Sequence, residues 1–218
     1  MQRTDAIYGA PPIDLGLVDL SPVEMMFWLY CPIKLAGHVA PVLPANLEQF
    51  YPLVSAAMSD CSDRAFESYI YLTAKTLWAT AENPGNRPGW HSDGFLTDDL
   101  NYIWCDANPT IFFDDGQRHA FSADHSSSLS EMDELCVRRS AHYRTYPVKH
   151  LLRLDQTVLH KVDTSIKPGV RTFVKVSVSR HRYALRGNSI NHSLAPDWIY
   201  QERQAERNCP IGKSGGEA

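Results

Sequence analysis

The sequence predicts a mainly β domain with a few flanking helices. Short runs at residues 68–80, 100–105 and 171–178 are rich in β-branched and aromatic side chains, and the last alternates apolar with polar residues as half-buried strands do. Clusters of Gly, Pro, Asn and Asp separate these runs and mark turns. Two stretches place apolar residues at helical spacing, so helices are expected to flank a β core.

The size and composition of the chain limit the possible architectures. Its 218 residues are the size of one domain, and 44% hydrophobic with 21% charged residues predicts a folded core. We therefore expect a single domain over residues 1–205, with its core at about 68–180, and a flexible tail over residues 206–218. A net charge of −4 provides no general attraction to a polyanion, so nucleic-acid binding would require a local patch.

The cysteines and the most apolar run near the N-terminus indicate the compartment. Five cysteines are scattered without a Cys-x-x-Cys pair, which argues against a disulfide framework and a zinc ribbon and for a reducing compartment. The apolar run at residues 25–30 is too short to span a bilayer. We therefore expect a cytoplasmic protein without a membrane partner.

The part of the chain before the first long strand is expected to form an extension and one helix. Six prolines in residues 1–45 disfavour long helices there, and the run at residues 25–30 should pack as a strand or a short helix. Asn46 is the expected N-cap of a helix whose apolar stripe ends near Asp60. After the first long strand, residues 82–89 form a loop suited to a mobile lid or a substrate loop.

Two further features are expected in the middle of the chain. The runs at residues 100–105 and 110–113 flank a turn signal and are predicted to form a β-hairpin. A polar loop follows, and Ser128 with Glu131 matches the capping box of a helix that runs to about Tyr143. This helix would be an insertion between strands.

The stretch at residues 89–95 is the first that carries chemistry. His91 and Asp93 stand two positions apart in a run that has the pattern of the start of a strand. Residues i and i+2 of a strand project from one face. His91 and Asp93 are therefore expected to point into one cavity and share one ion, while Ser92 points away.

A third ligand for that ion is expected from a distant strand. His160 lies in a Leu-rich run at residues 150–162, and Arg171 opens the last strand eleven residues later. Two histidines and one carboxylate on one face of a metal leave three coordination positions open, as in non-haem Fe(II) oxygenases. Arginine suits a carboxylate ligand because its planar fork matches the two oxygens and stays charged.

This pattern of His91, Asp93, His160 and Arg171 resembles the Fe(II)/2-oxoglutarate-dependent dioxygenases. The resemblance covers residues 69–179, about half the chain, and identifies no subfamily. It implies a double-stranded β-helix core, a jelly roll related to the cupins. It also implies Fe(II), 2-oxoglutarate and O2 as cofactors, and hydroxylation of a C–H bond with release of succinate and CO2.

The resemblance assigns roles to individual residues. His91, Asp93 and His160 would be the catalytic iron ligands, and Arg171 would pair with the distal carboxylate of 2-oxoglutarate. Further co-substrate contacts are expected from a neighbouring strand. The candidates are Lys75, Asn101 and Tyr102, with Lys175 and Ser177 as additional residues on the face of Arg171. The helix inserted between strands would shape the substrate entrance, as such insertions do in the family.

Other functions compete with the oxygenase. One is a cupin-like metalloenzyme that uses no 2-oxoglutarate, and another is a metal-free jelly-roll binding or assembly module in which the three ligands are structural. The expected substrate of the oxygenase is a small molecule, and a nucleobase or a protein side chain are the alternatives.

Two other groups of residues allow a binding role. His119 and His125, near Asp114, Asp115 and Asp124, form a competing metal set, although solvated loop histidines are the expected interpretation. Arginines also gather beside aromatic residues after Ser179 and are suited to phosphates or bases. A solvated edge is the expected interpretation there too.

Overall fold

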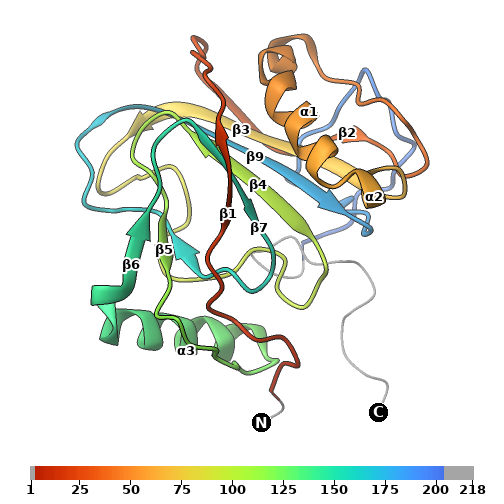
Figure 1. The fold of residues 1–218 in the computed structure, drawn as a ribbon. Helices are drawn as coiled ribbons and strands as arrows, with labels where there is room; N and C mark the ends of the chain where they lie inside the picture. The colour runs from red at the N-terminus through yellow and green to blue at the C-terminus, as the bar shows by residue number, and fades with distance from the viewer. Residues whose placement is uncertain (1–2, 204–218) are drawn as a thin grey trace.

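The computed structural model describes residues 3–203, which fold into two antiparallel sheets with three short helices (Figure 1). The large sheet has the strand order β1-β7-β4-β9-β3-β2 and the small sheet the order β6-β5-β8. The strands are β1 (Ile13–Leu17), β2 (Met26–Lys34), β3 (Tyr69–Ala79), β4 (Leu100–Cys105), β5 (Ile111–Phe113), β6 (Tyr143–Thr145), β7 (His150–Leu154), β8 (His160–Lys161) and β9 (Gly169–Ser179). The helices are α1 (Tyr51–Asp60), α2 (Ser62–Ala65) and α3 (His125–Arg138), with 3-10 turns at Ala45–Phe50 and Ser140–His142.

The chain passes back and forth between the two sheets. β3, β4, β7 and β9 lie in the large sheet, whereas β5, β6 and β8 lie in the small one. An isolated antiparallel bridge between His91 and His160 adds the segment between β3 and β4 to the edge of the small sheet at β8. Eight segments divided equally between two facing antiparallel sheets, with β5 and β6 consecutive in the small one, form a jelly roll. The expected mainly β architecture with a double-stranded β-helix core is therefore confirmed.

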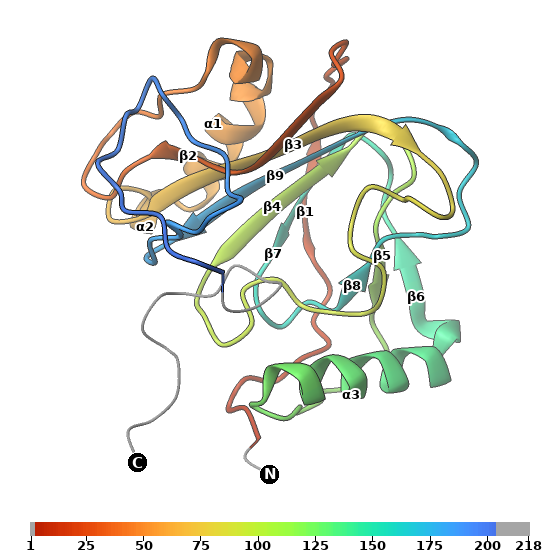
Figure 2. The ribbon, with the colours of Figure 1, turned by 180° about the vertical axis from the view of Figure 1, so that it is seen from behind.

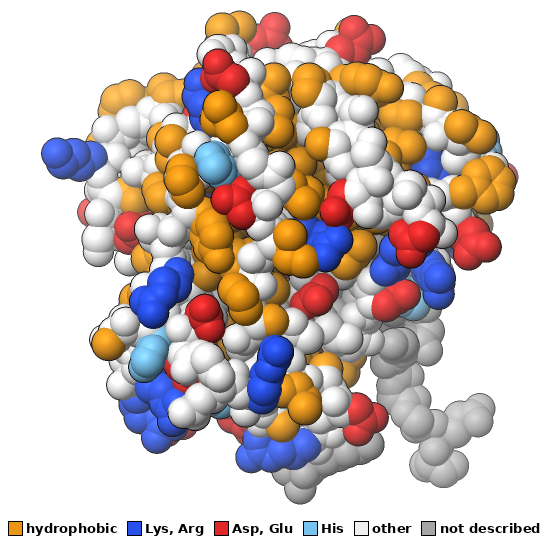
Figure 3. Space-filling view, viewed as in Figure 1, with side chains coloured by type: hydrophobic (Ala, Val, Ile, Leu, Met, Phe, Trp, Pro, Cys, Tyr) orange, Lys and Arg blue, Asp and Glu red, His pale blue; other side chains and the backbone are white. Residues whose placement is uncertain are grey.

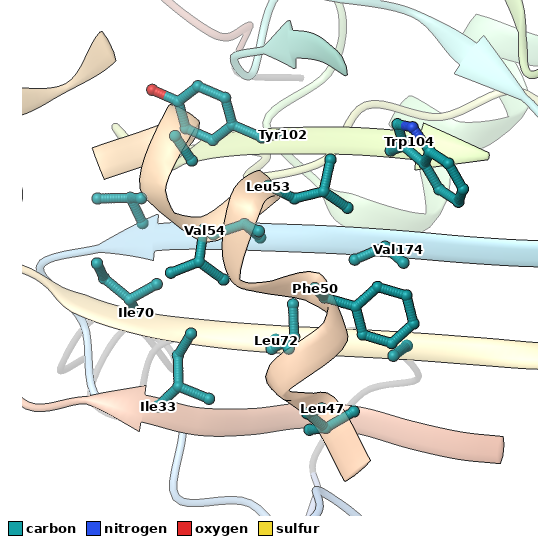
Figure 4. Close-up of a cluster of buried hydrophobic side chains, with 14 of the residues drawn as sticks. Ile33, Leu47, Phe50, Leu53, Val54, Ile70, Leu72, Tyr102, Trp104 and Val174 are labelled. Carbon is teal, nitrogen blue, oxygen red and sulfur yellow. The ribbon is translucent and has the colours of Figure 1, made fainter. Parts of the chain in front are cut away.

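The outer face of the large sheet carries the main hydrophobic core. Figures 1 and 2 show α1 lying across one face of this sheet, and α3 beside the small sheet at the other end of the molecule. In Figure 4, Phe50 and Leu53 from the helical segment point at Leu72 of β3 and Val174 of β9. Even-numbered residues of β3 and β9 face α1, so the odd-numbered residues face the small sheet.

The packing of α1 supports a prediction about stability. Leu53→Ala should lower the free energy of unfolding by about 2–5 kcal/mol, because Leu53 is 0% exposed and its loss leaves a cavity under α1. Leu17→Ala on β1 is the matched control, since Leu17 is 66% exposed. Figure 3 shows that hydrophobic side chains lie among charged ones on this side of the molecular surface. Leu17→Ala should change stability by less than about 0.5 kcal/mol. Urea unfolding followed by circular dichroism measures both, and equal effects would show that α1 is not docked.

The predicted hairpin at residues 100–113 is wrong. β4 pairs with β7 and β9 in the large sheet, whereas β5 pairs with β6 and β8 in the small sheet. The turn between them carries the chain from one sheet to the other. A four-residue connection can make either a hairpin or such a crossing, and only the distant strands decide between them.

The helix predicted from Asn46 to Asp60 is divided in two. Residues Ala45–Phe50 form a 3-10 turn without a side-chain cap, and α1 starts only at Tyr51. Pro52 explains the break, because proline has no N–H to donate and is tolerated in the first turn of a helix but not in its interior. The apolar stripe itself is buried as expected.

The helix predicted from Ser128 to Tyr143 begins and ends earlier. Asp124 is the N-cap of α3 and accepts a hydrogen bond from the backbone N–H of Ser127. Glu131 does not close a capping box on Ser128 but accepts from the backbone N–H of Ser122. Asp and Ser are equally good N-caps, so the local sequence allows the helix to begin after either residue. In the structure the helix begins after Asp124, and Glu131 then contacts Ser122.

Candidate metal centre

The inner face of the large sheet faces the small sheet. We define this inner face by the side chains of Lys75, Asn101, Arg171, Lys175 and Ser177. The register pairs Leu77 with Arg171, Lys75 with Phe173 and Asn101 with Ser177. Residues directly opposite each other in antiparallel strands project from the same face. The inner face therefore carries three cationic side chains within two neighbouring strands.

His91, Asp93 and His160 come together next to this face. One possible ligand atom from each of the three lies within 4.8 Å of those of the other two. The Nε2 atom of His160 is 3.8 Å from Oδ2 of Asp93, and the two imidazole rings are 4.5 Å apart between centroids. Ligands at right angles around an ion with bonds of about 2.1 Å lie about 3.0 Å apart, so a small closing movement would bring these atoms to ligation distance.

The backbone orients both imidazoles. Nδ1 of His91 lies 2.9 Å from the carbonyl oxygen of Gly89, and Nδ1 of His160 lies 3.3 Å from that of Val158. Each pair fits an Nδ1–H that donates to a carbonyl. Such a contact selects the tautomer whose Nε2 lone pair is available to a metal. The two backbones also bond to each other, His91 N–H to His160 O and the reverse, which fixes the separation of the rings.

The local structure around the cluster differs from the expected strands. His91 makes a single bridge, and Asp93 lies in a turn that continues through Gly94, whose φ is +70°. The Leu-rich run before His160 is likewise split by a turn between β7 and β8. The prediction that His91 and Asp93 start a strand is therefore wrong. The turn nevertheless brings both side chains to one place.

Asp93 forms an ion pair with Lys175, a contact that the sequence does not predict. Nζ of Lys175 donates to Oδ2 of Asp93 at 2.9 Å. Burial alone would raise the pKa of Asp93, but Lys175 and the two histidines outweigh it and hold that pKa far below its ordinary value. Burial also disfavours the Lys175 ammonium, yet Asp93 and Tyr30 raise its pKa above the usual value. Both groups are therefore charged.

Arg171 is a buried cation at the start of β9. It is 2% exposed, its Nε donates to the carbonyls of Ala107 and Asn108 at 3.1 Å each, and burial lowers its pKa. With the Asn86 amide oriented to suit its neighbours, Asn86 Oδ1 accepts from Nη1 at 3.3 Å. Nη2 is buried without a hydrogen-bond partner among residues 3–203. A buried guanidinium with an unsatisfied N–H is costly unless an anion binds it.

Lys75 lies between Arg171 and the metal cluster. Burial, followed by repulsion from Lys175 and Arg171, lowers its pKa to about 8, and Asp93 opposes this shift. Nζ of Lys75 donates to the carbonyl of Gly85 at 3.1 Å, so the loop at residues 82–89 contacts the inner face. The expectation that this loop serves the site agrees with its position, and its mobility stays a prediction.

The shifted Lys75 predicts a pH dependence of stability. The folded protein releases this proton near pH 8, whereas an unfolded chain holds it to about pH 10.4. The unfolded state therefore binds more protons between these values, and stability should rise with pH across that window. Lys75→Met should flatten this rise, and Lys167→Met, at an exposed position, should not. Urea unfolding at several pH values measures both slopes, and parallel curves for Lys75→Met and wild type would contradict the assignment.

The other proposed co-substrate contacts divide between the two faces. Asn101 and Ser177 lie on the inner face, where Ser177 Oγ donates to Asn101 Oδ1 at 2.6 Å. Tyr102 lies on the outer face, and its hydroxyl donates to Oδ2 of Asp60 at the end of α1 at 2.8 Å. The expectation for Tyr102 is therefore wrong. The period of two in a strand excludes adjacent residues from one face, so Asn101 and Tyr102 were incompatible candidates.

The competing metal set does not assemble in the described part of the chain. His119 Nε2 lies 3.0 Å from Oδ2 of Asp115, which Arg139 also contacts, and His125 begins α3. The described residues contain one further group with ligand spacing, Asp98, Asp99 and His181. Hydrogen bonds from Ser179 and Tyr183 occupy Asp99, and Asp98 pairs with Arg64 and Arg180. That group is therefore explained by protein contacts.

The arginines after Ser179 contact their own chain. Arg180 pairs with Asp98, Arg186 pairs with Glu202, and Arg182 lies over the ring of Trp198. These contacts agree with the solvated edge expected for this segment. The tail predicted at residues 206–218, together with Cys209, lies outside the described residues. No helix within residues 3–203 has the length and apolarity needed to cross a bilayer.

Comparisons with known proteins include a structural similarity. No protein-family model matches the sequence, and no curated protein matches it. A solved structure that is similar to the chain is that of an oxidoreductase of the 2OG-Fe(II) oxygenase family from Burkholderia pseudomallei. The two share 13% identity over 78% of this chain and 74% of that chain, with a TM-score of 0.38. The case for a function therefore rests on the geometry of this chain.

Proposed function

We propose that the protein is an Fe(II)- and 2-oxoglutarate-dependent dioxygenase that hydroxylates a C–H bond. The observation that carries the proposal is the convergence of His91, Asp93 and His160 beside a face on which Arg171 is buried with an unsatisfied N–H. A metal site alone would not require such an arginine. A metal site together with a buried cation is suited to a ligand that has a chelating end and a distant carboxylate.

The donor set fits Fe(II). Two imidazole nitrogens and one carboxylate oxygen are ligands that iron accepts, and three ligands on one side leave room for a bidentate co-substrate and O2. Asp93 is deprotonated, as a ligand must be, and the carbonyls of Gly89 and Val158 already fix both rings. An ion bound through Oδ2 of Asp93 would share this oxygen with Lys175.

Arg171 fits the distal carboxylate of 2-oxoglutarate. Its Nη2 would gain the hydrogen-bond acceptor that it lacks, and a charge-assisted pair would offset the desolvation of the guanidinium. The Ala107 and Asn108 carbonyls hold Nε, so the fork is already oriented. Phe173 packs against it, with the guanidinium carbon 5.3 Å from the ring centre.

The side chains of the site would position the reactants and exclude water. Bound Fe(II), 2-oxoglutarate and O2 would supply the oxidation that hydroxylates the substrate and releases succinate and CO2. Phe112 packs within 6.0 Å of the His160 ring, between centroids, and belongs with Val158 and Phe173 to one buried cluster. These apolar side chains lower the local dielectric constant and therefore strengthen the electrostatic contacts of the metal ligands. A small molecule remains the expected substrate, and a nucleobase or a protein side chain remain the alternatives.

An anaerobic titration tests the proposal. Protein mixed with Fe(II) and 2-oxoglutarate should develop the weak visible charge-transfer band of the chelate, and equilibrium dialysis should find one Fe(II) per chain. Metal binding without the band would overturn the proposal in favour of a cupin-like metalloenzyme that uses no 2-oxoglutarate. Absence of both would favour a metal-free binding or assembly module.

A further inference from the structure

The inner face holds more positive than negative charge. Lys75, Arg171 and Lys175 project from it, and within residues 3–203 Asp93 contacts Lys175 and Asp106 lies near Arg171, which leaves three positive charges against two negative ones. Asp99, at the end of the same face, accepts hydrogen bonds from Ser179 and Tyr183 instead. If the proposed function holds, Fe(II) and the 2-oxoglutarate dianion cancel each other. The inner face would then still carry a positive charge that no anion compensates.

Lys175 is a buried cation with fewer hydrogen-bond partners than N–H donors. An ammonium has three N–H donors. Lys34, another buried lysine, donates to the carbonyls of Leu35, Phe66 and Ser68. Nζ of Lys175 bonds to Asp93 and to the side chain of Tyr30, whose ring centre lies 5.1 Å away, so one of its three donors is left. Lys34 therefore has the contacts of a structural lysine, whereas Lys175 keeps donor capacity beside the metal cluster.

Metal binding would weaken the contact between Lys175 and Asp93. Oδ2 of Asp93 is the atom that contacts Lys175 at 2.9 Å and also lies nearest His160 Nε2, at 3.8 Å. A dication bound by this oxygen would stand next to the ammonium and repel it. The ammonium then requires a second anion to remain buried.

The backbone of β2 is distorted at the residue that covers Lys175. Tyr30 has a φ of +49°, and the pairing of β2 with β3 shifts register between Trp28 and Cys31. A left-handed conformation is costly for a bulky side chain and is found where the surrounding structure demands it. The bulge turns the Tyr30 ring over Lys175, which agrees with the role of bulges in re-aiming side chains next to binding sites.

A further donor on the inner face has no hydrogen-bond partner within residues 3–203. Nδ2 of Asn101 is buried without a hydrogen bond among the described residues, while its Oδ1 accepts from Ser177. Asn101 and Ser177 are register partners two positions beyond Lys175 on the inner face. An unsatisfied amide donor near an incompletely bonded ammonium is suited to an acceptor with more than one oxygen.

We propose that Lys175, covered by Tyr30, anchors a carboxylate group of the primary substrate beside the metal. The inference rests on the proposed function and specifies its substrate class, a small molecule that bears a carboxylate. The Asp93–Lys175 contact already shows a carboxylate oxygen seated on this ammonium at 2.9 Å. The anchor is separate from the co-substrate anchor, because Arg171 and Lys175 lie four residues apart, about 13 Å along the strand.

Paramagnetic relaxation tests this anchor without turnover. Protein loaded with Mn(II) and 2-oxoglutarate is titrated with acetate, benzoate, L-alanine and L-phenylalanine, and with the carboxamide of each. Proton relaxation by Mn(II) reports binding next to the metal. At least one acid should bind about tenfold or more tightly than its amide, because an ammonium discriminates between a carboxylate and a neutral group.

Variants at position 175 separate charge from shape. Lys175→Met should remove the preference for the acid, Lys175→Arg should retain part of it, and the exposed Lys167→Met should leave it unchanged. The affinity for 2-oxoglutarate is measured on the same samples by calorimetry. The effect of Lys175→Met on acid binding should exceed its effect on 2-oxoglutarate affinity by about tenfold or more.

Three results have distinct meanings. If no acid of the panel is preferred over its amide by the wild type, the proposed anchor is overturned. If Lys175→Met weakens 2-oxoglutarate binding as severely as a substitution of Arg171 does, Lys175 belongs to the co-substrate site and the anchor is again overturned. Failure of the proposed function is recognised separately, because the wild type then binds no 2-oxoglutarate in the presence of the metal.

Discussion

Replacing His160 with alanine is expected to lower the affinity for Fe(II) by at least about 100-fold and to abolish the charge-transfer band with 2-oxoglutarate. His160 supplies one of three protein ligands, and changes to groups that merely orient ligands already cost 10- to 100-fold in metal affinity. Anaerobic calorimetry with Fe(II), or with Mn(II) as an air-stable substitute, measures the loss.

The design of this experiment has to separate ligation from folding. His160 is buried, so alanine leaves a cavity, and His160→Gln is a second variant that keeps most of the volume. His150→Ala is the matched control, because His150 is a half-buried histidine of β7 whose Nδ1 contacts Asp14. A folded His160→Gln protein that still binds Fe(II) with wild-type affinity would remove His160 from the metal site.

Replacing Arg171 with methionine is expected to weaken 2-oxoglutarate binding by about 100-fold without destabilising the ligand-free protein. A hydrogen bond to a charged group contributes about 1.5–3 kcal/mol, and the upper value corresponds to a factor of about 150. Arg171 is buried without a carboxylate partner within residues 3–203, so an apolar side chain of similar length removes a desolvation cost that offsets the loss of the bonds to the Ala107 and Asn108 carbonyls. Calorimetry with 2-oxoglutarate and urea unfolding measure the two effects.

Arg153 is the matched control for Arg171, because it is an arginine with a carboxylate partner. It pairs with Asp60 at 2.8 Å on the outer face, and Tyr102 donates to the same carboxylate. Arg153→Met should therefore destabilise the protein and leave 2-oxoglutarate affinity unchanged, the reverse of the effects at Arg171. If Arg171→Met unfolds at a clearly lower urea concentration and keeps its affinity for 2-oxoglutarate, Arg171 is a structural residue.

The strands were the most predictable part of the fold. The runs at residues 68–80, 100–105 and 171–178 became β3, β4 and β9, because the choice between helix and strand depends on neighbouring residues. Helix boundaries were less predictable. Pro52 delayed the start of α1, and Asp124 and Ser128 offered competing caps for α3.

The residues of the candidate site were predictable as types and not as contacts. His91, Asp93, His160 and Arg171 could be chosen from the sequence because metal ligation and carboxylate binding demand particular side chains. The contact between Asp93 and Lys175 joins residues 82 positions apart, and local sequence carries no sign of such a pairing. The left-handed backbone of Tyr30 is equally invisible, because tyrosine seldom adopts it.

The sequence by itself determined that the molecule is mainly β, that the runs which form β3, β4 and β9 are strands, and which side chains are candidates to bind a metal and a diacid. The tertiary structure decided that β4 and β5 enter different sheets, that Tyr102 faces α1, and that Asp93 is paired with Lys175. The physical reason is the range of the interactions. Alternation and turn chemistry act over a few residues, whereas strand pairing and buried charge depend on segments that meet only after the chain has folded.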